Sequence, residues 1–157
     1  CRGIEIKQLG VNQCVKKGLS VIQGDANFDL EDYPAHSFTT AILSQTIQAM
    51  IYPENVIENL IRIAKRAIIS FPNFGYWKVR GEFLFSGRMP KNKILPYEWF
   101  NTPNIHLCSY KDFYDFCNLK KINIENFFSL NEEGDVINNY FLINLFTYQV
   151  IFCVSKQ

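Results

Sequence analysis

Several kinds of chemical signal are missing from this sequence. The five cysteines stand far apart and form no C-x-x-C pair, so zinc and thioredoxin spacings are absent. No P-loop, H-E-x-x-H or G-x-S-x-G motif occurs, and the eight glycines form no G-x-G-x-x-G turn. Histidine occurs only at His36 and His106, and neither has a Cys, Asp or Ser partner that sequence alone can assign. We therefore expect no metal site and none of the common catalytic or phosphate-binding signatures.

Excess charge and long apolar runs are also lacking. Sixteen Lys and Arg residues balance fifteen Asp and Glu residues, and a net charge of +1 gives no electrostatic case for nucleic acid or an anionic membrane. No apolar run reaches the roughly 18 residues that a membrane span needs. The odd number of cysteines favours free thiols in a reducing compartment, so we expect a cytoplasmic protein.

What is present is an abundance of apolar and aromatic residues. Hydrophobic residues make up 48% of the 157, with 14 Phe and 8 Tyr. This composition excludes a disordered chain and predicts an aromatic-rich core. The length suits one compact domain, so we expect residues 1–157 to form a single domain.

The first half alternates short apolar segments with amphipathic ones. We expect strands at residues 3–6, 19–22, 39–43 and 67–71, with helices over residues 8–17 and from Pro53 onward. Gly18 is placed to end the first helix, and Pro53 to open the second. This alternation predicts an α/β fold with a doubly wound, mostly parallel sheet covered on both faces.

The second half is less regular. A helix over residues 77–85 is expected to end at Gly87, and the proline-containing stretch 88–106 reads as a long loop that is either functional or mobile. Ser109 and Asp112 form a capping signal for a further helix, and residues 122–128 and 148–154 read as two more strands.

Polar residues follow the expected parallel strands at the points where ligands bind in open sheets. They are Glu5, Asp25, the pair Ser44-Gln45 and the pair Pro72-Asn73. One carboxylate there can accept the two hydroxyls of a ribose, and a second can accept from an adenine amino group. The pair of acids suits an adenosine-containing ligand. The alternative stays open that these residues are polar because strand ends meet water and cap helices.

Two Pro-Asn loops, in ISFPNFGYWKVR and FNTPNIHLCS, raise a second expectation. We predict that Pro72, Asn73 and Phe74 form one rim of a substrate or partner cleft together with Asn104 and His106. The alternative is that the asparagines only shape loops, since Asn bonds to nearby backbone and tolerates unusual dihedral angles.

Large aromatic residues stand near the same loops. Trp77, Tyr97 and Trp99 are candidates for a partner surface, and core filling is the alternative for each of them.

Four strings in the chain resemble the methionine-biosynthesis protein MetW family. They are ILSQTIQAM, RAIISFPNFGYWKVR, GRMP and LPYEWFNTPNIHLCS. The resemblance implies a class I methyltransferase fold, whose seven-stranded sheet has an antiparallel last strand. It also implies that the first strand and its glycine-rich loop precede residue 1. Without that strand, its two neighbours are expected to expose unpaired edges.

The resemblance also implies a cofactor, S-adenosylmethionine or S-adenosylhomocysteine. Glu5, with Ile6, matches the acid that holds the ribose, and Asp25 and Ala26 match the adenine contact. Ser44-Gln45 follows the fourth strand of the family's sheet.

One element of amino-directed methyltransferases is missing after that strand. Where they carry Asn/Asp-Pro-Pro-aromatic, this chain has Ser44-Gln45-Thr46, which offers no evident general base. His106 is then the one candidate catalytic residue.

Three functions remain open. The first, implied by the resemblance, is a partner and activator of homoserine O-acyltransferase that binds the cofactor. The second is an active S-adenosylmethionine-dependent methyltransferase acting on a small molecule, so enzyme status is unsettled. The third is a dinucleotide-dependent oxidoreductase, because an acid after the second strand also suits a nicotinamide ribose. The sequence also leaves a homo-oligomer open.

Overall fold

The computed structural model describes residues 1–138 and 141–157. Its elements, in chain order, are β1 (Gly3–Glu5), α1 (Gln8–Lys16), β2 (Val21–Gln23), the 3₁₀ turn η1 (Asp29–Asp32), β3 (Phe38–Ser44), the 3₁₀ turn η2 (Ile47–Ala49), α2 (Pro53–Ile63), β4 (Ala64–Pro72), α3 (Trp77–Ser86), α4 (Tyr110–Leu119), β5 (Ile122–Leu130), α5 (Ile143–Phe146) and β6 (Gln149–Lys156).

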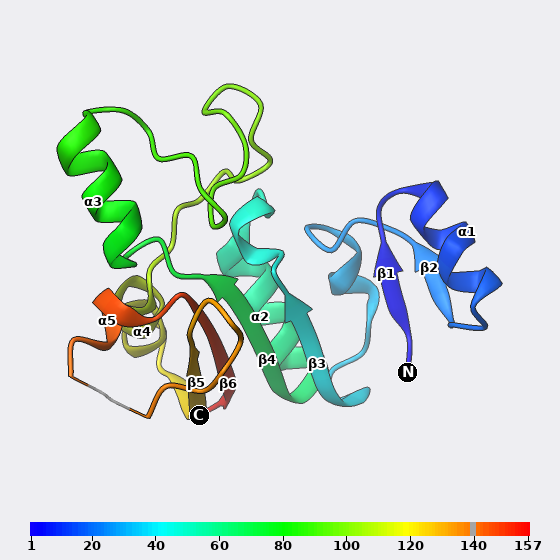
Figure 1. Ribbon diagram of the computed structural model, residues 1–157. Coiled ribbons are helices and arrows are strands. Elements are labelled where there is room, and N and C mark those ends of the chain that lie inside the picture. Colours follow the sequence, from blue (N-terminus) through cyan, green and yellow to red (C-terminus); the bar gives the residue numbers. More distant parts are fainter. Residues whose placement is uncertain (139–140) are drawn as a thin grey trace.

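The described strands form two separate sheets. β1 pairs in parallel with β2, and the other four strands lie in the order β3-β4-β6-β5 (Figure 1). β3 and β4 are parallel, whereas β6 runs antiparallel to both β4 and β5. The predicted α/β fold with an antiparallel last strand is confirmed.

The main core lies on one face of the four-stranded sheet. Alternate residues of the two central strands are completely buried there: Ala67, Ile69, Phe71, Val150, Phe152 and Val154. Helices α2 and α4 cover this face, and the Phe113 ring of α4 lies 4.7 Å from the Phe152 ring. On the opposite face Ile68, Ile151 and Cys153 are only half-buried, so the described helices leave that face partly open.

Residues 27–33 join the two sheets. Leu30 is buried in the main core, and the Arg62 guanidinium of α2 donates to the carbonyls of Tyr33 at 2.8 Å and Leu30 at 2.9 Å. The side-chain oxygen of Asn27 accepts from the backbone N–H groups of Ile51 at 2.9 Å and Tyr52 at 3.1 Å. The loop after β2 is thereby fixed against the loop that follows β3.

Local signals read from the sequence set the helix ends. Gly18 and Gly87 adopt left-handed dihedrals, with φ of 75° and 63°, directly after α1 and α3. Ser109 and Asp112 form a reciprocal capping box at the start of α4. These predictions are confirmed. The short elements η1, η2 and α5 were not predicted, because their three or four residues show no capping or periodic pattern.

The thiols are free, and two of them are held unreactive by burial. No disulfide links the five cysteines, and desolvation raises the pKa of Cys108 and of Cys117 to about 12. Throughout the part of the chain that the structure describes, no helix combines the length and the apolar character needed to cross a membrane.

Candidate functional site

The exit of β3 is a strained turn at the carboxyl edge of the larger sheet. Gln45 has a φ of 53°, a left-handed conformation that is costly for a residue with a side chain. Its backbone N–H donates to the Ser70 carbonyl at 2.9 Å, and the Ser44 and Ser70 hydroxyls lie 3.2 Å apart. β4 therefore holds Ser44 and Gln45 in a fixed geometry, with both side chains exposed.

Gln48, three residues further on, was missed by sequence reasoning. Its side chain is 7% exposed, and its Nε2 donates to the Gln45 carbonyl at 2.9 Å. Its Oε1 is buried without a hydrogen-bond partner among the described residues. A buried acceptor without a donor is costly, so this atom marks a point where a ligand N–H or O–H could bind. No local pattern distinguishes Gln48 from a surface glutamine.

The two acids predicted for cofactor binding lie at neighbouring strand ends. Glu5 ends β1 and Asp25 follows β2; the strands are parallel, and the Gly24 N–H donates to the Glu5 carbonyl at 3.1 Å. Their placement at one common sheet edge is confirmed. Ile6, beside Glu5, is 58% exposed.

Both acids also have local structural roles. One Glu5 oxygen accepts from the Lys7 N–H at 2.9 Å, and a side chain at Gly10 would come within 2.8 Å of the Glu5 side chain. One Asp25 oxygen accepts from the backbone and the side chain of Asn27 at 2.9 and 2.8 Å. In each carboxylate the second oxygen has no hydrogen-bond partner within residues 1–138 and 141–157. Ala26 packs against the main core.

The first Pro-Asn loop is buried. Pro72, Asn73 and Phe74 are all buried, and Asn73 is completely inaccessible to solvent. The Asn73 amide nitrogen donates to the carbonyls of Asn144 at 2.9 Å and Thr147 at 2.8 Å. Its oxygen accepts from the N–H groups of Gly75 and Tyr110, both at 3.0 Å. All its hydrogen-bonding capacity is used, which fits the loop-shaping alternative.

The second Pro-Asn loop is more exposed and lies against the exit of β3. The N–H groups of Ile105 and His106 both donate to the Gln48 carbonyl, at 2.8 and 3.0 Å. Asn104 is half-buried and His106 is exposed. A hydrogen bond of 3.2 Å from the Phe74 N–H to the Cys108 carbonyl links this segment to the first loop. The structure therefore brings the two Pro-Asn loops together, with His106 beside Gln48.

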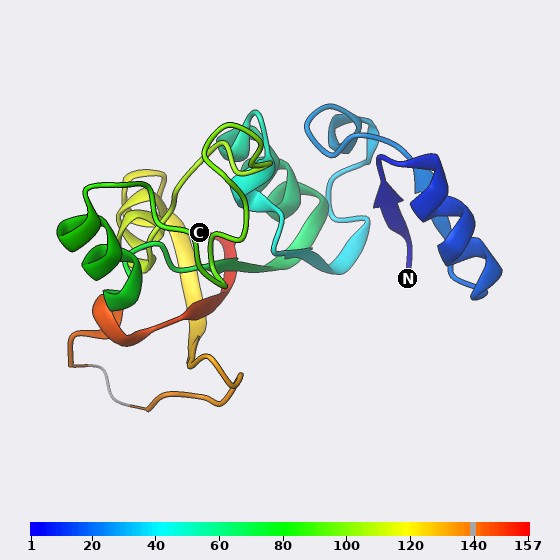
Figure 2. The same cartoon turned by 45° about the horizontal axis from the view of Figure 1, so that its top comes forward.

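Exposed apolar side chains are concentrated in residues 77–107, hereafter the aromatic segment. Trp77, Tyr97 and Trp99 are 47%, 50% and 73% exposed, so the alternative that they fill the core is wrong for all three. Further members are Phe83, Leu84, Phe85, Met89, Phe100, Ile105 and Leu107, of which Phe85 is 89% exposed. Helix α3 and the loop after it project beyond the carboxyl edge of β3 and β4 (Figures 1 and 2).

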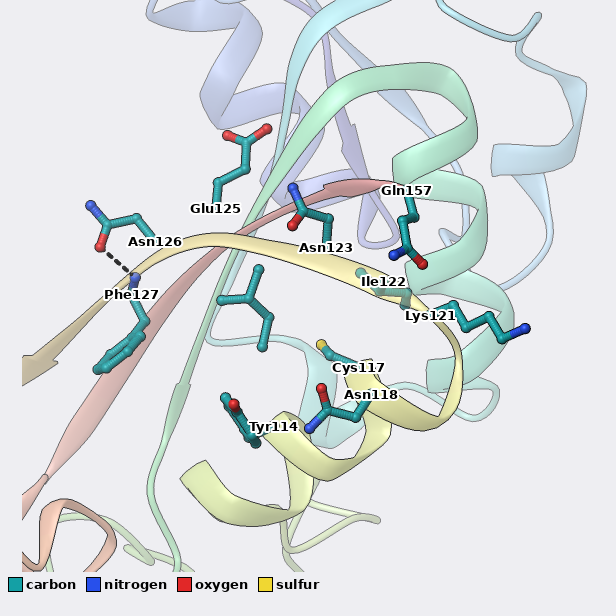
Figure 3. Close-up of a pocket in the computed structure, with 11 residues that line it drawn as sticks. Tyr114, Cys117, Asn118, Lys121, Ile122, Asn123, Glu125, Asn126, Phe127 and Gln157 are labelled. Atoms are coloured by element: carbon teal, nitrogen blue, oxygen red, sulfur yellow. Dashed lines mark hydrogen bonds between the residues drawn. The ribbon is translucent and has the colours of Figure 1, made fainter.

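A hollow lies at the end of the four-stranded sheet opposite to the carboxyl edge of β3 and β4. It has a volume of about 830 Å³ and is formed where the end of α4 meets the start of β5, with Tyr114, Cys117 and Asn118 on the helix side (Figure 3). Glu125, an acidic residue of the lining, points away from these helix residues in Figure 3. Ligands of open α/β sheets bind at the carboxyl edge, so we do not assign this hollow as the functional site.

The arrangement at the carboxyl edge suits binding better than proton transfer. The β3 exit presents hydroxyl and amide groups, and the backbone N–H of His106 is hydrogen-bonded beside them. Within the described ranges, no group of three or more His, Cys, Asp or Glu residues is placed to hold a metal ion.

Comparisons with known proteins place the chain in a family. The family described as "Methionine biosynthesis protein MetW" matches residues 1–154. A curated relative from Rhodopirellula baltica, the "Bifunctional methionine biosynthesis protein MetXA/MetW", is 37% identical over 106 residues. That match covers 65% of this chain but 16% of the relative, so the chain spans about a sixth of that protein's length.

Solved structures show the same fold at low sequence identity. A crystal structure from Thermotoga maritima, described as a SAM-dependent methyltransferase and "possible histamine N-methyltransferase", aligns with a TM-score of 0.70 at 19% identity, covering 99% of this chain and 72% of that one. The cyclase SpnF aligns with a TM-score of 0.63 at 12% identity, covering 99% and 66%. A cyclase and a methyltransferase share this fold, so the fold does not fix the reaction. The chain therefore belongs to the methionine biosynthesis protein MetW family and has the fold of the class I S-adenosylmethionine-dependent methyltransferases.

Proposed function

We propose that this protein binds homoserine O-acyltransferase, the partner that the family resemblance implies, and supports its activity. The observation that carries the proposal is the aromatic segment, where large apolar side chains remain exposed. A concentration of exposed apolar side chains is typical of interaction sites, and tryptophan and arginine are enriched at interface centres. The name of the Rhodopirellula relative, which joins MetXA with MetW, supports the same pairing.

Charge in the aromatic segment favours an acidic partner surface. Residues 77–107 contain Lys78, Arg80, Arg88, Lys91 and Lys93 against two acids, Glu82 and Glu98. Five cations minus two anions leaves +3, whereas the whole chain carries +1. Complementary charge steers association and fixes orientation more than it adds affinity.

We also propose that the protein binds S-adenosylmethionine or S-adenosylhomocysteine at the carboxyl ends of β1, β2 and β3. Glu5, with Ile6 beside it, and Asp25, with Ala26, each offer a free carboxylate oxygen, which suits ribose hydroxyls and an adenine amine. Ser44 and Gln45 then face the remainder of the cofactor. When bound, S-adenosylmethionine supplies an activated methyl group. S-adenosylhomocysteine, the demethylated product, has no methyl group to transfer and acts as a binding ligand alone.

Substitution of Trp99 tests the partner proposal. Trp99→Ala is expected to weaken binding to the acyltransferase by about tenfold or more, because buried tryptophans dominate interface energies. Leu119→Ala is the matched control, since Leu119 is 78% exposed but lies at the end of α4, outside the aromatic segment. Co-purification and calorimetry measure the affinity, and steady-state kinetics measure the acyltransferase turnover. An acyltransferase whose turnover does not change at saturating partner would contradict the proposal.

A second candidate function is methyl transfer to a small molecule. It is favoured by the position of His106, whose backbone N–H donates to the Gln48 carbonyl. The Oε1 atom of the same glutamine is buried and has no hydrogen-bond partner among the described residues. On this hypothesis Gln48 orients an acceptor N–H or O–H and His106 receives the proton that the acceptor releases. Incubation with methyl-labelled cofactor and cell extract tests it, and absence of transfer to any acceptor, with cofactor binding intact, would exclude it.

A further inference from the structure

A small cavity lies on the side of β4 remote from β1 and β2. It has a volume of about 260 Å³ and forms where the start of α3, the turn at residues 92–94 and the connection between β5 and β6 meet. Its lining includes Tyr76, Lys78, Lys93, Ile94, Glu132 and Tyr148. The cofactor proposal does not use this cavity, and the partner proposal uses Lys78 and Lys93 only as part of the overall charge of the aromatic segment.

Glu132 is an ionised carboxylate held in place at this cavity. One of its oxygens accepts from the Tyr76 hydroxyl at 2.9 Å and from the Lys78 ammonium at 2.5 Å. The hydrogen bond from Lys78 is the main reason that the pKa of Glu132 lies below its ordinary value. Its other oxygen has no hydrogen-bond partner in the described parts of the chain, although the side chain is only 19% exposed.

Lys93 supplies an opposite charge without an ion pair of its own. No carboxylate lies within ion-pairing distance of it among residues 1–138 and 141–157, and its positive charge helps to lower the pKa of Glu132. The cavity therefore presents a free carboxylate oxygen and a free ammonium group on the same lining.

The rest of the lining is Asn92 together with aromatic and aliphatic groups. The rings of Tyr76 and Tyr148 stand perpendicular to each other with centroids 5.7 Å apart, and Ile94 is buried beside them. The volume is below the range of about 300–1,000 Å³ typical of pockets for drug-sized ligands, so the occupant must be smaller.

From these contacts we propose that the cavity binds a free α-amino acid. The ligand ammonium bonds to the free oxygen of Glu132, the ligand carboxylate pairs with Lys93, and the ligand side chain lies against the Tyr76 and Tyr148 rings. A ligand with only a carboxylate would leave the free oxygen of Glu132 without a donor, and one with only an ammonium would leave Lys93 without an anion. The zwitterion satisfies both groups at once.

The test is direct binding to this chain, independent of any acyltransferase or cofactor. L-Methionine and L-homoserine are titrated by calorimetry, with 4-(methylthio)butanoate and 3-(methylthio)propylamine as analogues of methionine that lack the ammonium or the carboxylate. In a Trp99→Phe background, Trp77 is the one tryptophan left, and the Lys78 ammonium lies 5.6 Å from its ring centroid, so its fluorescence gives a second readout. Saturable binding of at least one of the amino acids is expected, with both analogues at least about tenfold weaker.

Substitutions separate the proposed site from general charge effects. Glu132→Gln and Lys93→Met are each expected to weaken amino-acid binding about tenfold or more. Lys91→Met is the matched control, because Lys91 pairs with Glu98 and does not line the cavity. Lys93 is exposed, so Lys93→Met keeps the test valid even if Glu132→Gln fails to fold. Absence of saturable binding up to about 10 mM, equal affinity for the analogues, or an equal loss in Lys91→Met would overturn the proposal.

Discussion

Asn73 is completely buried, and its amide group connects three separate parts of the chain. It bonds to the turn after β4, to the first residue of α4, and to α5 and the residue that follows it. Asn104, in the second Pro-Asn loop, makes within the described parts of the chain a single local hydrogen bond, from its backbone N–H to the Thr102 hydroxyl at 3.1 Å. The same dipeptide therefore has two different roles.

This difference predicts unequal effects of the same substitution. Asn73→Ala leaves two N–H groups and two carbonyls, each buried or partly buried, without their partner, so the free energy of unfolding is expected to fall by about 3 kcal/mol or more. Asn104→Ala is expected to change it by less than about 0.5 kcal/mol. Urea denaturation followed by circular dichroism measures both values. Equal losses in the two variants would show that Asn73 does not have this connecting role.

At the scale of single elements, α4 depends on its cap. Ser109 Oγ accepts from the Asp112 N–H at 3.3 Å, while the Asp112 carboxylate accepts from the Ser109 N–H at 3.0 Å. α4 supplies Phe113 and Cys117 to the main core and begins directly after the aromatic segment and Cys108. Fraying of its first turn would loosen both the core and the second Pro-Asn loop.

Ser109→Ala is accordingly expected to lower the free energy of unfolding by about 1 kcal/mol, the usual cost of losing an N-cap. Ser86→Ala is the control, because Ser86 is an exposed serine at the end of α3 whose hydroxyl bonds to the carbonyl of Glu82 in its own helix. It is expected to change stability by less than about 0.5 kcal/mol. The cap would be shown unimportant if chemical denaturation gave the same midpoint for Ser109→Ala as for the unmodified chain.

The longer elements could be predicted because their signals are local. Pro53 and the spacing of Val56, Ile57, Leu60 and Ile61 predict α2, and all four of these apolar residues are buried. α5, by contrast, has four residues and follows Leu142, whose φ of 53° no sequence pattern indicates. The sequence did not predict where α2 ends: the helix stops at Ile63 and Ala64 begins β4, because helix ends are less strongly encoded than helix centres.

For the candidate site, sequence predicted strand ends but not the contacts between them. Glu5 and Asp25 follow from strand periodicity and from the rule that ligands bind at carboxyl edges. Asn27, Gln48 and Arg62 matter through hydrogen bonds to distant segments, which depend on the tertiary fold and leave no local pattern.

At the scale of the whole molecule, each of the two sheets ends in an edge strand, β1 in one and β3 in the other, that has no partner on its outer side among the described residues. Among the described residues, β1 pairs only with β2, and β3 pairs only with β4. β1 and β3 point the same way (Figure 1), and residues 27–33 fix their carboxyl ends on one side. Ile42, in the middle of β3, is 68% exposed on the open face of the sheet. Unpaired, apolar strand edges of this kind are normally covered in native proteins.

We expect that a parallel strand from polypeptide outside residues 1–157 fills the place between β1 and β3. Hydrogen exchange tests this on a chain extended at its N-terminus with its natural preceding sequence. The outward-facing amides of β1 and β3 are expected to exchange at least about tenfold more slowly in the extended chain, because each gains a carbonyl partner. Amides of β4 and β6, which already have neighbours on both sides, serve as the internal control and should change much less. If the β3 amides exchange equally fast with and without the extension, these edges stay open, and the two-sheet arrangement is the native one.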